Sequence, residues 1–118
     1  MSDSRRASGQ DGEVLALAHL QRQGLRLIAR NWSCRAGELD LVMLEGDTVV
    51  FVEVRYRRHD AWGGALESID ARKRQKLIRA AQFFLLREQR WASHPSRFDV
   101  VALGASPDLN WIRNAFDG

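Results

Sequence analysis

Two hydrophobic runs in the first half of the chain flank a short polar turn. Residues 37–44 and 49–56 are rich in valine and leucine, and a Gly46-Asp47 pair stands between them. A Gly-Asp pair between two such runs is typical of a tight antiparallel hairpin. With the turn centred on that pair, the facing residues are Leu44–Val49, Val42–Phe51, Asp40–Glu53 and, one step further out, Glu38–Arg55.

Asp40 and Glu53 thus place two acids at directly opposite positions of the predicted hairpin. Like charges there are destabilising, and a partly desolvated carboxylate is costly without a counter-charge. A divalent cation such as Mg²⁺, which binds carboxylate, water and phosphate oxygens, would supply one. Alternatively, both acids are solvated on an open sheet face and Glu38 pairs with Arg55. A register shift of one residue would put the acids on opposite faces and remove the case for a shared metal.

Hydrophobic spacing elsewhere predicts two helices and three further strands. Helical periodicity covers residues 12–23, with Gly24 as a stop, and runs from an N-cap at Asp70 to about residue 89. The other predicted strands are 25–31, 97–103 and 109–116, and the predicted loops are 32–36 and 57–64. The order α-β-β-β-α-β-β predicts an α/β fold in which helices flank a mixed sheet.

The length of 118 residues is that of a single domain. Residues 1–11 are polar and predict a flexible tail, so the domain is expected to span 12–118. No apolar run is long enough to cross a membrane and the N-terminus does not resemble a secretory signal, which predicts a cytoplasmic protein. The lone Cys34 can form neither an internal disulfide nor a CxxC motif.

The basic residues are clustered, although the formal net charge is only +3. In the second predicted helix, Arg72, Lys76 and Arg79 share one face at i, i+4 and i+7, and Lys73 and Arg74 lie beside them. Faces of this kind are usually just solvated, but a single-signed run favours contact with a phosphate backbone. Arg57 and Arg58 begin a glycine-rich loop with an aromatic residue, a composition that also suits nucleic acid.

Other signatures are absent. The chain contains no HExxH, GxxxxGK[ST], GxSxG or GxGxxG motif, and its three histidines are scattered.

Glu13 shares the edge of the core-facing stripe of the first helix, so its carboxylate could point inward. Its spacing alone favours an ordinary acid in a first helical turn, where the helix dipole is favourable.

Several short motifs between residues 12 and 103 together carry a family resemblance. They are Gly12-Glu13, Arg30-Asn31-Trp32, Gly37-Glu38-Leu39-Asp40-Leu41, Phe51-Val52-Glu53-Val54-Arg55, Lys73 and Arg97-Phe98-Asp99-Val100-Val101. With these residues the chain resembles the restriction endonuclease-like nucleases, whose signature is D…(D/E)xK. Within that superfamily it is most similar to the small bacterial YraN family, whose nearest characterised relatives are the archaeal-type Holliday junction resolvases.

The resemblance implies a metal-dependent endonuclease acting on branched or structured DNA. Asp40 and Glu53 would hold Mg²⁺, or Mn²⁺ in its place, with the Val54 carbonyl as a further ligand. Glu13 would complete the acidic cluster, against the interpretation from its spacing. The DNA backbone would be held by Arg57, Arg58, Arg72, Lys73, Lys76 and Arg79. Junction resolution requires two symmetric active sites, so a homodimer is expected if junctions are the substrate.

One position departs from the signature, because Arg55 stands where the superfamily has lysine. Arginine stays charged and keeps only the electrostatic roles of that lysine, so catalysis could be weakened or absent. Three hypotheses therefore follow from the sequence: an endonuclease, a nucleic-acid-binding module that keeps the fold without catalysis, and a protein-interaction domain whose basic helix binds an acidic partner.

Overall fold

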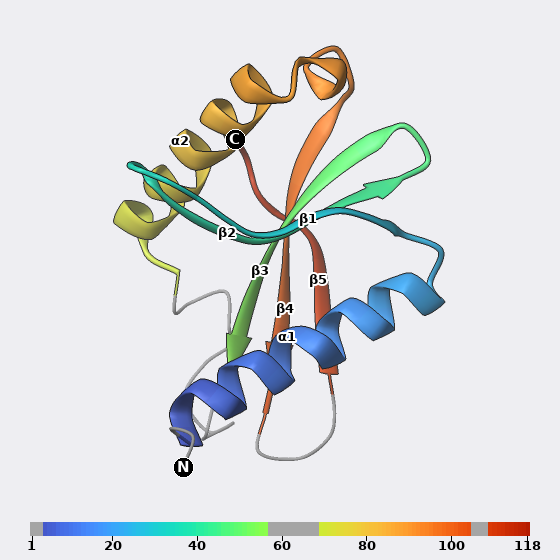
Figure 1. Cartoon of the computed structure of the whole chain (residues 1–118), viewed down its shortest axis with the longest axis vertical. Helices are drawn as coiled ribbons and strands as arrows, with labels where there is room; N and C mark the ends of the chain where they lie inside the picture. Colours follow the sequence, from blue (N-terminus) through green and yellow to red (C-terminus); the bar gives the residue numbers. More distant parts are fainter. Residues whose placement is uncertain (1–3, 57–68, 105–108) are drawn as a thin grey trace.

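The computed structural model describes the backbone of residues 4–56, 69–104 and 109–118, and the side chains from residue 12 onward. The elements in chain order are α1 (Ser4–Arg22), β1 (Arg26–Cys34), β2 (Gly37–Glu45), β3 (Thr48–Tyr56), α2 (Ala71–Arg87), the 3-10 helix η2 (Gln89–Trp91), β4 (Ser96–Leu103) and β5 (Leu109–Phe116) (Figure 1). The mixed α/β class and the order of helices and strands predicted from the sequence are both confirmed.

The strands form one five-stranded sheet in the order β1-β2-β3-β4-β5. Neighbouring strands are antiparallel except β3 and β4, which are parallel. Parallel neighbours need a crossover connection, and α2 lies in that connection. β5 is at an edge of the sheet, as predicted. The middle strand of the five is β3, which carries Glu53.

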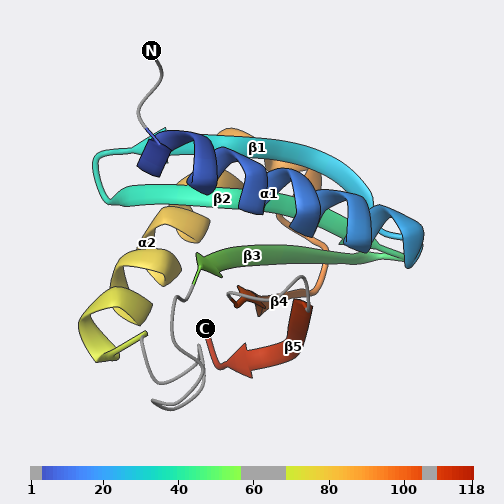
Figure 2. The same cartoon turned by 90° about the horizontal axis from the view of Figure 1, so that it is seen from below.

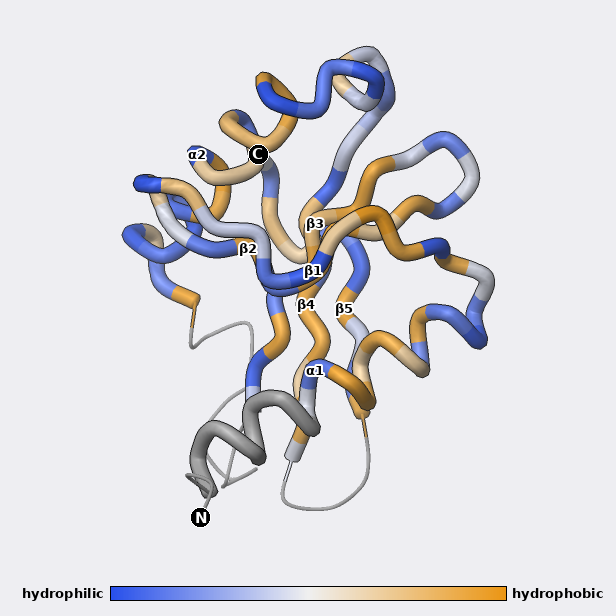
Figure 3. The backbone as a smooth tube through the Cα atoms, viewed as in Figure 1, coloured by the Kyte–Doolittle hydropathy of each residue, from blue (hydrophilic) through white to orange (hydrophobic). Residues whose placement is uncertain are grey.

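The two helices cover opposite faces of the sheet (Figure 2). Val50 and Val52 of β3 pack in one buried cluster with Leu20 of α1, whereas the intervening Phe51 packs in a second cluster with Phe84 of α2. Burial on both faces explains why the central strands are nearly continuous hydrophobic runs (Figure 3). No helix in the described ranges is long and apolar enough to cross a membrane.

Three predicted boundaries were wrong. β1 continues to Cys34 instead of ending at Asn31, because residues 32–34 pair with residues 37–39 of β2. The second helix ends at Arg87 and is followed by η2. The first helix begins at Ser4 and not at Gly12; residues 4–11 lack proline, and a packed helix can extend into a polar segment. The flexibility predicted for residues 1–11 stays a prediction.

Candidate active site

The β2–β3 hairpin has the predicted register. Val42 pairs with Phe51 and Leu44 with Val49 around a turn in which Gly46 adopts a φ of 59°. Glycine adopts that left-handed conformation without steric cost. The last pair of the ladder is Leu41–Val52, and one step further the two strands separate into a fork (Figure 1). Asp40 and Glu53 stand on the two sides of this fork.

Asp40 keeps contact across the fork through its side chain. Its half-buried carboxylate accepts a hydrogen bond from the backbone N–H of Val54, with an N–O distance of 2.9 Å. The carboxylate thereby takes the place of a main-chain acceptor just beyond the end of the ladder. This bond fixes Asp40 against β3, next to Glu53.

Glu53 is a buried acid, with a relative exposure of 6%. Its carboxyl group is hydrogen-bonded to the side chain of Asp40. Burial, followed by the negative charge of Asp40 and this hydrogen bond, raises the pKa of Glu53 to about 7, against the opposing effect of Lys73 and Arg55. Two cations face the same carboxylate oxygen: Lys73 Nζ and Arg55 Nη1 each lie 3.5 Å from Glu53 Oε2. Both cations therefore contact the Glu53 member of the acid pair.

The start of α2 determines where Lys73 lies. Asp70 is the N-cap, and its side chain accepts a hydrogen bond of 2.9 Å from the backbone N–H of Lys73. This first turn runs beside β3, so the ammonium group of Lys73 meets Glu53. The sequence predicted Lys73 only as a nucleic-acid-binding residue. Its contact with Glu53 depends on the path of α2 and left no signal in the local sequence.

Glu13 approaches the fork from the opposite face of the sheet. It is half-buried on α1, and burial together with the charge of Asp40 raises its pKa. The side chain of Asn31 donates a hydrogen bond to it. Asn31 adopts a φ of 52° within β1, a conformation that asparagine tolerates better than most residues. The charge of Asp40 thus acts on Glu13, and the place in the acidic cluster that the family resemblance implies for Glu13 stays a prediction.

The donor set limits the kind of metal site that fits. In the described part of the chain, no group of three or more His, Cys, Asp or Glu side chains could hold a metal ion. A cation between Asp40 and Glu53 would therefore have two protein carboxylates and would take its other ligands from water, substrate or backbone carbonyls. Mg²⁺ commonly binds in this way, through one or two carboxylates and several waters.

The predicted basic surface is present in part. Arg72, Lys76 and Arg79 are exposed along one face of α2. Arg74 is not part of this face, because its Nε donates to the Ile69 carbonyl and its guanidinium lies over the Phe116 ring. Arg57 and Arg58, with the rest of the loop 57–64, lie outside the described residues.

Comparison with known proteins assigns the chain to a family. Residues 12–103 match the model described as "Uncharacterised protein family UPF0102". The chain belongs to the UPF0102 family. A UPF0102 protein of Stutzerimonas stutzeri is 70% identical over 120 residues, covering 99% of each chain. UPF0102 proteins of Pseudomonas fluorescens and Pseudomonas aeruginosa are 67% identical over 121 residues and 64% over 120, covering at least 98% of this chain and 96% of the relative.

Membership in the UPF0102 family confirms the YraN-type resemblance. The matched segment begins at Gly12 and ends at Leu103, so it contains Glu13, Asp40, Glu53 and Lys73. The descriptions of the family and of these relatives name no activity. The function must therefore be argued from the fork itself.

Proposed function

We propose that this UPF0102 protein is a Mg²⁺-dependent endonuclease that hydrolyses phosphodiester bonds in structured or branched DNA. One observation carries the proposal: Asp40 and the buried Glu53 meet in the β2–β3 fork, and Lys73 and Arg55 each lie 3.5 Å from Glu53. Paired carboxylates suit a hard divalent cation, and neighbouring cations suit the phosphate on which it would act.

Asp40 and Glu53 would be the metal-holding residues, and the Val54 carbonyl would be a further ligand. Binding requires both carboxylates to be ionised, so it would strengthen as the pH rises through the pKa of Glu53, about 7. The N–H of Val54 orients Asp40 in either state. Mg²⁺ or Mn²⁺, when bound, would polarise the scissile phosphate and lower the pKa of an attacking water.

Lys73 and Arg55 would divide the roles of the signature lysine. Arg55 keeps its charge and can stabilise negative charge on the phosphate, whereas a lysine can also change its protonation state. Lys73 supplies an amine at the same oxygen of Glu53. Glu13, with its raised pKa and its position near Asp40, would accept a proton from water in the fork.

The basic face of α2 would hold the DNA backbone. Arg72, Lys76 and Arg79 are exposed on the helix whose first turn reaches Glu53. Contacts from these side chains to phosphates position a duplex without reading its sequence. They would orient a scissile phosphate near the fork.

A second candidate function is nucleic-acid binding without catalysis. The observation that favours it is Arg55 itself, which occupies the lysine position of the signature. In that case the fork would hold a structural cation or a proton, and the basic face of α2 would remain the functional surface.

Incubation of the purified protein with linear, flapped and four-way DNA in Mg²⁺, Mn²⁺ or chelator separates these functions. Asp40→Asn is compared with Asp47→Asn, the same substitution at an exposed position of the same hairpin. We expect the wild-type protein to cleave DNA only with the metal present. Asp40→Asn should reduce the cleavage rate by more than roughly 100-fold, the largest effect typical of residues that contact a metal ligand without binding the metal themselves. Asp47→Asn should leave the rate unchanged. Arg55→Lys is expected to retain cleavage or increase it.

Binding without cleavage under every condition would support the binding module. Absence of binding even at low salt, where phosphate contacts are strongest, would contradict both functions.

A further inference from the structure

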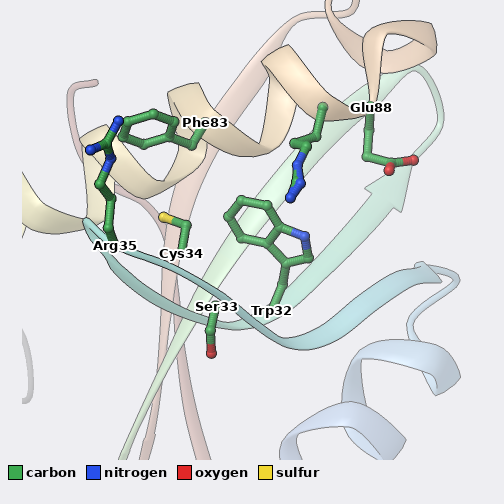
Figure 4. A pocket seen from close by; sticks show the side chains of 7 residues that line it. Trp32, Ser33, Cys34, Arg35, Phe83 and Glu88 are labelled. Atoms are coloured by element: carbon green, nitrogen blue, oxygen red, sulfur yellow. The ribbon is translucent and has the colours of Figure 1, made fainter.

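A pocket of about 410 Å³ opens between the tip of the β1–β2 hairpin and the second half of α2, away from the acidic fork. Figure 4 shows the Phe83 ring on α2 and the Trp32 indole on β1, with the Cys34 sulfur on the side of Phe83 and Ser33 directed away from α2. The remaining lining residues are Arg35, Arg87 and Glu88. Its volume lies in the lower part of the range, roughly 300–1,000 Å³, of small-molecule sites.

The two aromatic rings of the pocket are held in place by their neighbours. The indole of Trp32 makes an edge contact with the buried Phe84 ring, with 5.3 Å between centroids. The guanidinium of Arg35 lies 5.9 Å from the centroid of Phe83. Both rings are half-buried. Trp32 therefore offers a fixed apolar surface, whereas the Arg35 guanidinium must move aside for a flat ligand to stack on that face of Phe83.

The charge around these rings is mostly positive. Arg35 and Arg87 are exposed, and Glu88 is the only acid among the residues that line the pocket. Phe83 and Arg87 lie on the same side of α2 as its basic face. Positions 72, 76, 79, 83 and 87 are spaced by three or four residues, which places them along one face of a helix. The exposed basic residues of α2 and its pocket-lining residues Phe83 and Arg87 therefore lie on one face of the helix.

The distance from Lys73, beside the acidic fork, to Phe83, in the pocket, is short enough for one nucleic-acid molecule to contact both. Ten residues of helix between Lys73 and Phe83 correspond to about 15 Å along its axis. At roughly 3.4 Å per nucleotide of duplex, that is the length of four or five nucleotides.

We propose that this pocket binds an unpaired nucleobase, which stacks on Trp32 and Phe83 while Arg35 and Arg87 contact the adjoining phosphates. Aromatic surfaces flanked by arginine are suited to bases of a single strand, since every base has a stackable face. Glu88 can accept a hydrogen bond from the amino group of a base. The inference rests on the proposed function for the class of ligand, nucleic acid. It adds that the bound form has an unpaired nucleotide a few positions from the cleavage point.

The test compares two fluorescently labelled strands of equal length, an oligodeoxycytidylate and an abasic deoxyribose-phosphate strand, in low salt with chelator. Phe83→Ala removes one stacking ring, and Leu86→Ala is the matched control, since Leu86 is 67% exposed on the same helix and does not line the pocket. Trp32→Phe keeps an aromatic ring against Phe84 and removes the indole. Circular dichroism verifies that each variant is folded.

We expect the wild-type protein to bind the base-bearing strand roughly 5- to 100-fold more tightly than the abasic strand, as stacking of one base implies. Phe83→Ala should lose most of that preference and Leu86→Ala should keep it. Binding should quench tryptophan fluorescence in the wild-type protein and less so in Trp32→Phe.

Equal affinity of the wild-type protein for the two strands, or an unchanged preference in folded Phe83→Ala, would overturn the pocket assignment. These results would leave the proposed function intact as long as both strands bind. Failure of both strands and of duplex DNA to bind at low salt would overturn the proposed function as well.

Discussion

Glu53 and Asp99 are buried acids on adjacent parallel strands, β3 and β4, but their surroundings differ. Asp99 is fully buried and accepts four hydrogen bonds of 2.8–3.1 Å, two from Arg97 and one each from the Trp111 ring and the Asn114 backbone. Glu53 has cations only at 3.5 Å and shares a hydrogen bond with the second acid, Asp40.

The difference separates a structural acid from a functional one. A buried carboxylate whose oxygens are all paired contributes to a rigid core, and removing it leaves its donors unsatisfied. In a buried carboxylate next to another acid, the ionised form is destabilised and the pKa is raised. A bound cation would stabilise the ionised form and lower that pKa again. We therefore expect mutation of Asp99 to affect mainly stability, and mutation of Glu53 to affect mainly the response to pH and to metal.

The largest expected effect is on stability at Asp99. Asp99→Ala should lower the free energy of unfolding by about 3 kcal/mol, because it leaves Arg97, Trp111 and Asn114 without their acceptor. Urea denaturation followed by circular dichroism measures this, with exposed Asp117→Ala as the control. Glu53→Gln should not destabilise the protein at pH 8. Similar losses at Asp99 and Glu53 would contradict the distinction between the two acids.

The next effect is a pH dependence that arises from Glu53. Its pKa in the folded protein, about 7, is above the ordinary value of 4.5, so between these values the folded state binds more protons than the unfolded state. The contribution of Glu53 to the free energy of unfolding is therefore fully present below about pH 4.5. It is lost as the pH rises through 7, which lowers the free energy of unfolding by about 1–3 kcal/mol. Urea denaturation in chelator at pH 5, 6, 7 and 8 should show this decrease relative to Glu53→Gln. Parallel pH profiles of the two proteins would rule it out.

Mg²⁺ should counteract that decrease. Because binding requires ionised Asp40 and Glu53, added Mg²⁺ should raise the free energy of unfolding at pH 8 more than at pH 5.5. At ten times the dissociation constant the gain is about 1.4 kcal/mol. Thermal denaturation with and without Mg²⁺ measures it, and Asp40→Asn and Glu53→Gln should each abolish it. An equal shift in Asp40→Asn would place the metal elsewhere.

The smallest effect concerns Lys73. Its charge opposes the rise in the pKa of Glu53, so Lys73→Met should raise that pKa further and move the pH-dependent loss of stability upward. Lys76→Met, on the exposed side of the same helix, is the control and should leave the profile unchanged. Coinciding profiles for the two variants would show that Lys73 does not act on Glu53 in solution.

The sequence predicted those parts of the site that depend on neighbours along the chain. The turn at Gly46 and the alternation of side chains determine the hairpin register, so they were sufficient to pair Leu41 with Val52, one step before Asp40 and Glu53. Asp70 likewise marked the start of α2 through its capping hydrogen bond. These features follow from local backbone geometry, which leaves a periodic signal in the sequence.

The tertiary structure alone decided which distant residues join that hairpin. Lys73 reaches Glu53 because α2 crosses one face of the sheet, and Glu13 comes within the electrostatic influence of Asp40 because α1 covers the other. The pocket at Trp32 and Phe83 likewise depends on where the β1–β2 hairpin ends against α2. Contacts between segments tens of residues apart arise from the packing of hydrophobic faces, which specifies that a helix is buried but not which charged side chain it carries to which strand.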